Sequence, residues 1–211
     1  MVSLFNPLNR LLLLAAGALL CAVSFLFDDP VIAWVGAHSN RGVRHAAQFF
    51  TRWGDFLPIV GVLLVVLLVA WVLKRSMRIP LVMLGSAIAG GLAANLLRVL
   101  TGRARPSTPG AYGWYGLWDH GRWIAGSYGY SSFPSAHTAV AIACVAPLWI
   151  LLQGRRRVLV AGPATLVAFC IAASRILLNA HHLSDVLASV WLGVLVSWVI
   201  CGWVGARVQA A

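Results

Sequence analysis

Acidic residues are almost absent from this chain of 211 residues, which contains no glutamate and only five aspartates. Charged residues of both signs make up 10% of the sequence, whereas soluble domains carry about 25%. Hydrophobic residues make up 61%, and the mean hydropathy is +0.86. This composition excludes a water-soluble globular domain and is typical of an integral membrane protein.

Lysine is also scarce: of the 16 lysine and arginine residues, Lys74 is the one lysine. The formal net charge of the chain is +11. In a membrane protein such an excess serves topology and anionic headgroups, so we predict no nucleic-acid partner. The preference for arginine has two explanations, codon bias or the bidentate guanidinium fork, which suits phosphate and carboxylate. Composition does not separate them.

Cysteine is rare, and all four cysteines lie inside apolar segments, where they behave as small hydrophobes: Cys21, Cys144, Cys170 and Cys201. We predict no disulfide framework, no metal site and no cofactor. The cluster of His181, His182 and Asp185 is not interpreted as a metal site, because no second acidic cluster supplies further ligands.

Long apolar segments are abundant and number six: 11–27, 56–73, 79–97, 136–153, 159–178 and 186–204. The first lacks a small-x-small cleavage site, so we expect it to be retained. We predict an all-α integral-membrane bundle of six transmembrane helices, forming a single domain over 1–211. Segment 30–55 mixes aromatic and cationic residues and predicts one amphipathic helix at the membrane interface. Small residues in the third segment predict close helix packing.

The short basic connections predict the orientation in the membrane. Lys74, Arg75 and Arg78 crowd the second connection, and residues 155–157 crowd the fourth, so both are expected to be cytoplasmic. Both termini are then cytoplasmic, and the outer face carries all five aspartates and all six histidines. We therefore expect a multi-pass protein of the bacterial plasma (inner) membrane with an extracytoplasmic active site.

A histidine and an aspartate follow the fifth apolar segment at a spacing that suits catalysis. Arg175 lies near the end of this span, where an unpaired cation needs an anionic partner. His181 and Asp185 are four residues apart, so they share a face if the sixth helix begins near His181. A carboxylate that orients one imidazole nitrogen leaves the other as a nucleophile or base. We expect His182 to point away and to be structural.

Two further segments supply groups that bind anions. Pro134 is expected to place residues 135–137 in the first turn of a helix, where free N–H groups, the Ser135 hydroxyl and His137 converge. Arg98 and Arg105 are about two helical turns apart, with Pro106 closing the helix. Guanidiniums that hold phosphate, one imidazole that attacks phosphorus and a second that protonates the leaving oxygen together indicate phosphoryl transfer.

The three segments resemble the signature of the type 2 phosphatidic acid phosphatase superfamily, K-x6-R-P, P-S-G-H and S-R-x5-H-x3-D. They match Arg98–Pro106, Pro134–His137 and Ser174–Asp185, with Arg98 in place of lysine and Ala136 in place of glycine. The resemblance implies a metal-independent membrane phosphatase that works through a phosphohistidine. It assigns the nucleophile, its orienting partner and the general acid to His181, Asp185 and His137. It assigns phosphate binding to Arg98, Arg105, Arg175, Ser135 and the backbone N–H of Ala136.

The loop over 107–133 is rich in aromatic residues and glycine. An interfacial aromatic belt is one explanation. The other is a lid over the substrate, to which Trp114 and Trp118 would contribute and in which Asp119, His120 and Arg122 would set headgroup preference. The length of the loop favours the lid.

We therefore expect a phosphatase acting on a phosphate monoester or diphosphate of a membrane lipid, with a phospholipid or polyprenyl phosphate as substrate and no nucleic acid. Undecaprenyl diphosphate, phosphatidylglycerophosphate, phosphatidic acid and a lipid A phosphate all offer the same phosphoryl group. One alternative is a lipid phosphotransferase with the same site, and another is a non-catalytic lipid-phosphate binder or transporter. The sequence does not indicate an oligomeric state.

Overall fold

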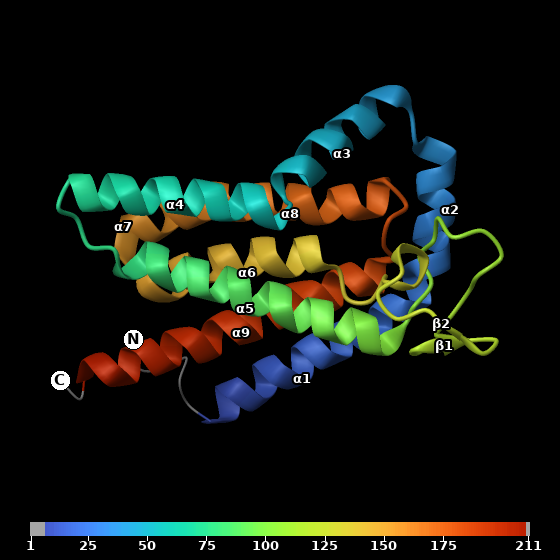
Figure 1. Ribbon diagram of the computed structural model, residues 1–211. Coiled ribbons are helices and arrows are strands. Elements are labelled where there is room, and N and C mark those ends of the chain that lie inside the picture. Colours follow the sequence, from blue (N-terminus) through green and yellow to red (C-terminus); the bar gives the residue numbers. More distant parts are fainter. Residues whose placement is uncertain (1–6, 210–211) are drawn as a thin grey trace.

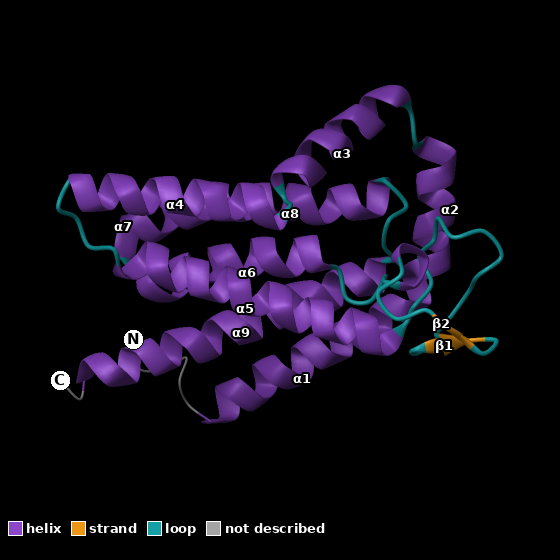
Figure 2. Ribbon diagram, in the orientation of Figure 1, coloured by secondary structure: helices purple, strands orange, loops and turns teal. Residues whose placement is uncertain are grey.

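The computed structural model describes residues 7–209, which form a bundle of helices with a loop cluster at one end (Figures 1 and 2). The longer helices are α1 (Pro7–Ser24), α2 (Asp28–His38), α3 (Arg41–Trp53), α4 (Phe56–Val72), α5 (Arg78–Thr101), α6 (Ala136–Leu151), α8 (Gly162–Leu177) and α9 (Leu183–Gln209). The short elements are η2 (Phe25–Phe27), β1 (Trp118–Asp119), β2 (Arg122–Trp123), η3 (Tyr128–Tyr130), α7 (Gly154–Arg156) and η4 (Arg157–Ala161).

Each of the six predicted apolar segments is helical. Within the described residues four helices are long and apolar enough to cross a membrane, or up to five if the pair α3 and α4, bent by 56°, is taken as one. The first of the four continues from α1 through η2 into α2, over Leu11–His38. Helix α6 is apolar but has 16 residues. The protein is therefore a helical membrane protein, as predicted.

Helix α6 lies at the centre of the bundle and packs against α5, α8 and α9. Small residues allow these helices to approach closely, as the third apolar segment predicted. A Cβ added at Gly90 of α5 would lie 2.8 Å from Ala143 Cβ of α6, and one added at Gly193 of α9 would lie 3.0 Å from Ala139 O. Gly85, by contrast, faces open space. The core therefore depends on backbone proximity at particular glycines.

The prediction of a single amphipathic helix over 30–55 is wrong, because the segment forms α2 and α3 with a break at Ser39 and Asn40. Asn40 adopts an extended conformation, and its side-chain oxygen accepts a hydrogen bond from Val43 N at 3.0 Å. An N-cap of this kind starts a new helix. The amphipathic element is α3, whose apolar face packs on α8 (Figure 1).

The expectation that Pro106 closes the third apolar helix is also wrong. Helix α5 ends at Thr101, and Gly102 follows in the left-handed conformation with φ of 56°. A Cβ at Gly102 would lie 1.8 Å from Gly116 O, so both the conformation and the close approach require glycine. Because the chain turns here, Arg98 lies on α5 whereas Arg103 and Arg105 lie in the loop.

The loop over 107–133 contains the only strands of the described residues, so the all-α prediction misses a small hairpin. Strands β1 and β2 pair antiparallel, Trp118 with Trp123 and Asp119 with Arg122. His120 and Gly121 form the two-residue turn and both have positive φ, 46° and 77°, as a tight hairpin turn requires.

We expect Gly90→Ala to destabilise the protein by about 1–3 kcal/mol, the usual cost of overpacking, because the new methyl group meets Ala143 and the α6 backbone. The matched control is Gly85→Ala in the same helix, which adds a methyl group in open space and should leave stability unchanged or slightly higher. Unfolding midpoints of the detergent-solubilised variants in an SDS titration measure both effects. Equal midpoints for the two variants would contradict the assigned packing.

Candidate active site

The three motif segments converge at one end of the bundle, where α5 ends and α6 and α9 begin (Figure 1). The buried polar residues of this end include arginine, histidine and aspartate side chains that carry or accept charge: Arg103, Arg105, Arg175, His181, His182 and Asp185. Buried charges are costly unless they are paired. Their concentration in one place indicates a functional site.

His181 is 2% exposed and is held by the backbone of the loop before α6. Its Nδ1 lies 2.7 Å from the carbonyl oxygen of Ser132. A carbonyl only accepts hydrogen bonds, so Nδ1 carries the proton and Nε2 keeps its lone pair. Burial lowers the pKa of His181 from 6.5 to about 4, and the Asp185 carboxylate opposes this effect. The imidazole is therefore neutral at physiological pH, with a free lone pair on Nε2.

Asp185 lies beside His181, as the spacing predicted, although through a different local structure. Helix α9 begins at Leu183, so His181 precedes it. The distance from Asp185 Oδ2 to His181 Nδ1 is 3.6 Å, longer than the bond from Nδ1 to Ser132 O. The same Oδ2 accepts hydrogen bonds from Ser132 Oγ at 2.5 Å and from His182 N at 2.8 Å. Asp185 thus places a fixed negative charge beside the His181 ring, while the hydrogen bond to Ser132 O orients the ring.

The expectation that His182 points away from this group is wrong. Its Nδ1 lies 3.2 Å from Asp185 Oδ2, and its side chain is buried. The expectation applied the rotation of 100° per residue in a helix, but residues 181 and 182 lie outside α9, so the rule does not hold there.

His137 lies in the first turn of α6, as the Pro134 prediction required, and faces a cavity of about 300 Å³ between α4, α5 and α6. Its Nε2 is 3.9 Å from Asp55 Oδ1. Asp55 also caps α4 by accepting from Phe56 N at 2.7 Å. Sequence reasoning missed Asp55, because it belongs to none of the three motif segments. The cavity has a polar end at Asp55, Arg98 and His137 and an apolar wall that includes Phe56, Ile88, Leu92 and Val140.

Arg175 and the start of α6 offer donors for an anion. Arg175 is buried in the last turn of α8, where it donates a hydrogen bond to Thr51 Oγ1, and its Nε has no partner among the described residues. Ser135 is fully buried at the N-cap of α6. Ala136 occupies the first helical position, where the backbone N–H has no partner within the helix. A bound phosphate would satisfy these donors.

Two further arginines, Arg105 and Arg98, were also predicted to bind phosphate, and they lie in different surroundings. Arg105 is buried, and its three nitrogens donate to backbone carbonyls of Tyr128, Ala180 and Ser131 at 2.8, 3.1 and 3.0 Å. Burial lowers its pKa, but arginine remains cationic. Arg98 lines the cavity beside His137. Electrostatic interactions connect His137 with Arg175, Asp55, His181 and Arg105, so these residues form one site.

Arg103 is a site residue that sequence reasoning missed. It is 6% exposed, and its NH1 lies 2.5 Å from Asp185 Oδ1 while its NH2 lies 2.7 Å from Asp28 Oδ2. Asp28, at the start of α2, is 4% exposed. The available signal was that an aspartate following an apolar span needs a cationic partner when it is buried.

The predicted lid residues divide into two groups. The Trp114 ring lies 4.8 Å from Arg103 Cζ and 5.1 Å from the Phe133 ring, so it packs beside the site. Trp118, Asp119, His120 and Arg122 belong to the hairpin, which projects from the loop cluster (Figure 1). Asp119 contacts His120 and the Tyr130 hydroxyl rather than the buried arginines.

Comparisons with known proteins agree with this geometry. A family model described as the PAP2 superfamily matches residues 79–209. A lipid A 1-phosphatase from Rhizobium johnstonii is 26% identical over 196 residues, which cover 84% of this chain and 75% of the relative. A second, from Rhizobium etli, is 26% identical over 181 residues and covers 80% of this chain and 73% of the relative.

Two solved structures share the fold. One is a transmembrane PAP2 type phosphatidylglycerolphosphate phosphatase from Bacillus subtilis, with a TM-score of 0.70 and 17% identity, covering 93% of this chain and 96% of that one. The other is LpxE from Aquifex aeolicus, with a TM-score of 0.57 and 16% identity, covering 83% and 95%.

We expect His181 to stay neutral down to about pH 4, well below the usual histidine pKa of about 6.5, because the ring is buried and protonation would add a third positive charge to those of Arg105 and Arg175. Carbon-13 histidine NMR of the protein in micelles, titrated between pH 3.5 and 8, measures this directly. A His181→Gln variant identifies the resonance. A midpoint near 6.5 for His181 would show that the imidazole is not desolvated as described.

We expect Arg175→Lys to weaken binding of inorganic phosphate by about tenfold to a hundredfold, corresponding to one charge-assisted hydrogen bond of about 1.5–3 kcal/mol, because lysine lacks the planar fork. Competitive inhibition by phosphate measures the change. Arg52→Lys, at an exposed position of α3, is the matched control and should behave as wild type. Unchanged phosphate inhibition in Arg175→Lys would remove this residue from the phosphate site.

Proposed function

Because the chain belongs to the PAP2 superfamily, we propose that it is an integral-membrane lipid phosphate phosphatase that uses His181 as its nucleophile. The observation that carries the proposal is the hydrogen bond of 2.7 Å between His181 Nδ1 and Ser132 O. This bond sets the tautomer, so that Nε2 has the free lone pair needed to attack phosphorus. Because the His181 imidazole is neutral, no separate base is needed to deprotonate it before it attacks.

In the first step, the bond from Nε2 of His181 to phosphorus forms while the bond from phosphorus to the lipid oxygen breaks. The electron pair of the broken bond remains on that oxygen, which takes a proton from His137. The ring of His181 then carries a positive charge, and Asp185, 3.6 Å from Nδ1, stabilises it. We assign binding of the phosphoryl oxygens to five groups: Arg98, Arg105, Arg175, Ser135 and the backbone N–H of Ala136.

In the second step, water attacks phosphorus and gives its proton to the now neutral His137. The electron pair of the phosphorus–nitrogen bond returns to Nε2, and inorganic phosphate leaves. Both proton transfers and both substitutions use side chains of this protein, so we expect turnover in the presence of a chelator. The carboxylate of Asp55, 3.9 Å from His137 Nε2, supports the protonated form that the first step needs and acts against the opposing effects of burial, Arg175 and Arg105.

The cavity beside His137 supports a lipid substrate. Its polar end, at Arg98 and His137, suits a phosphate, and its apolar wall on α4, α5 and α6 suits a hydrocarbon chain. A lipid that diffuses in the bilayer could then present its headgroup at the end of the bundle. The loop over 107–133 is proposed as the lid, and Trp114, whose ring lies beside the Arg103 guanidinium, is its proposed substrate-facing side chain.

We propose that α1, α4, α5, α6, α8 and α9 are six membrane spans and that α3 lies at the outer interface. The α4–α5 connection and α7, which carry most of the basic residues of the short loops, lie at the end of the bundle opposite the site (Figure 1). The positive-inside rule then orients the site toward the extracytoplasmic side. Helix α1 begins and α9 ends at the proposed cytoplasmic end, while residues 1–6 and 210–211 lie outside the described part.

Among the candidate substrates a lipid A phosphate comes first, because both sequence relatives are named lipid A 1-phosphatases. Phosphatidylglycerophosphate comes next, from the name of a structural neighbour. Undecaprenyl diphosphate and phosphatidic acid complete the panel. Transfer of the phosphoryl group to another lipid is the second candidate function, since it needs only an acceptor other than water.

We expect His181→Ala to lower phosphate release by about 10⁴-fold or more, as removal of a catalytic nucleophile does, while the protein stays folded in detergent. The assay uses the four lipids with EDTA present and follows both free phosphate and phosphorylated lipid products. His45→Ala, at an exposed position of α3, is the control and should retain full activity.

Each arm of this assay has a distinct meaning. Near-normal turnover by His181→Ala would reject the nucleophile. Loss of wild-type activity in EDTA, restored by a divalent cation, would reject metal independence. Labelled phosphate recovered mainly on a second lipid would favour the transferase. Binding of a lipid without release of phosphate, across the whole panel, would favour a non-catalytic binder.

A further inference from the structure

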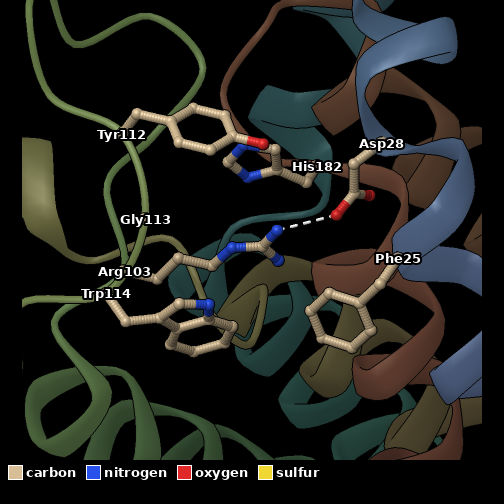
Figure 3. Close-up of a pocket in the computed structure, with 7 residues that line it drawn as sticks. All are labelled: Phe25, Asp28, Arg103, Tyr112, Gly113, Trp114 and His182. Atoms are coloured by element: carbon tan, nitrogen blue, oxygen red, sulfur yellow. Dashed lines mark hydrogen bonds and ion pairs between the residues drawn. The ribbon is translucent and has the colours of Figure 1, made fainter.

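Three buried charges of alternating sign lie in a row behind His181. Arg103 NH1 contacts Asp185 Oδ1 at 2.5 Å, and Arg103 NH2 contacts Asp28 Oδ2 at 2.7 Å. None of the three side chains is more than 8% exposed. Figure 3 shows Arg103 reaching Asp28, with Phe25 and Trp114 beside the guanidinium. The row therefore extends from the catalytic neighbourhood to the N-terminal helices.

The order of these charges matters for the proposed reaction. Arg103 alone would neutralise Asp185 and so weaken its attraction for a positively charged His181 ring. With Asp28 on the other side of Arg103, the three residues together carry one net negative charge. Little water screens charges in a buried site, so that net charge acts strongly on the neighbouring imidazole. The further positive groups that act on His181 are Arg105 and Arg175, and both oppose a charge on the ring.

Asp28 is also fixed with respect to α9. Its Oδ1 accepts from Ser184 N at 2.8 Å, and its Oδ2 accepts from Ser184 Oγ at 2.6 Å. Ser184 is in the first turn of α9, next to Asp185, where the free N–H groups of a helix favour an anion. The same serine accepts from Arg103 NH1 at 2.7 Å. Asp28 thus has three close contacts, two from Ser184 and one from Arg103, which hold its carboxylate in place.

Asp28 lies outside residues 79–209, which the family model matches. It comes from the segment that joins the first apolar helix to the interfacial helices. The row of charges is therefore assembled from the matched region and a separate part of the chain.

We propose that Asp28 is a positioning residue for catalysis, which acts through Arg103 to keep the negative charge of Asp185 available to His181 when the ring becomes positively charged. This proposal rests on the proposed function, because it requires a charged His181 intermediate. Asp28 contacts neither His181 nor the cavity at His137. Its effect is therefore on kcat and the rate of phosphoenzyme formation, and not on the binding of substrate.

The first test is Asp28→Asn, which keeps the shape of the side chain and removes its charge. We expect kcat to fall by about tenfold to a hundredfold, the range seen for outer partners of active-site imidazoles at metal sites, with KM within about twofold of wild type. The matched control is Asp29→Asn, the same change at the next residue, which is exposed and accepts a hydrogen bond from the Tyr112 hydroxyl. Asp28→Glu retains the charge and should recover much of kcat.

The second test separates charge from structure. The double variant Asp28→Asn with Arg103→Gln restores the single negative charge, because Asp185 is then the one charged member of the row. We expect its kcat to exceed that of Asp28→Asn alone. A purely structural role predicts the opposite, a further loss as more hydrogen bonds are removed. If Asp28→Asn does not fold, the double variant is compared with Arg103→Gln, and the two should have similar kcat because Asp28 is proposed to act through Arg103.

Both tests use as substrate the lipid that the wild-type protein turns over fastest in the four-lipid assay. Single-turnover experiments with this lipid, labelled in its phosphate, measure the rate at which the phosphoenzyme forms. Wild-type kcat in Asp28→Asn, with His181→Ala inactive, would overturn this inference and leave the proposed function intact. A double variant slower than Asp28→Asn would also overturn it. Activity in His181→Ala would instead reject the proposed function on which the inference rests.

Discussion

The burial of one carboxylate, Asp185, is the constraint on which the rest of the structure depends. Asp185 is fully buried at the start of α9, and a buried charge is tolerated only when its oxygens are paired and hydrogen-bonded. Arg103 satisfies Oδ1, while Ser132 Oγ and His182 N satisfy Oδ2. Each partner comes from a segment that must be held in place by its own contacts.

Those contacts bring distant parts of the chain together. Arg103 requires Asp28, which fixes the end of the first apolar helix to α9. Ser132 also orients His181 through its carbonyl, so one residue serves both the acid and the imidazole. On the other side of the site, Thr51 of α3 contacts Arg175 of α8. Helix α3 is therefore connected to Arg175, one of the residues assigned to phosphate.

Membrane burial explains why this polar cluster lies at one end of the bundle. Along the length of α6 the buried neighbours are mainly apolar, and glycines on α5 and α9 allow close backbone approach. Polar groups that lack partners are expensive in such a setting. Helix ends offer free N–H groups, loop carbonyls and access to headgroups, so chemistry on a lipid phosphate is placed there. The same arrangement leaves a cavity with an apolar wall beside His137.

The sequence by itself determined the six apolar helices and the three motif segments, since long hydrophobic runs and fixed residue spacings are local properties of the chain. It also determined that Pro134 precedes the first turn of α6. Only the tertiary structure decided the break at Asn40, the end of α5 at Gly102, the contact of His182 with Asp185, and the recruitment of Asp28, Asp55 and Thr51. The recruited residues depend on partners 80 or more residues away, such as Asp28 with Ser184 at a separation of 156 and Thr51 with Arg175 at 124. Local pattern carries no information on which buried charges will meet, because that is settled by the packing of the helices that carry them.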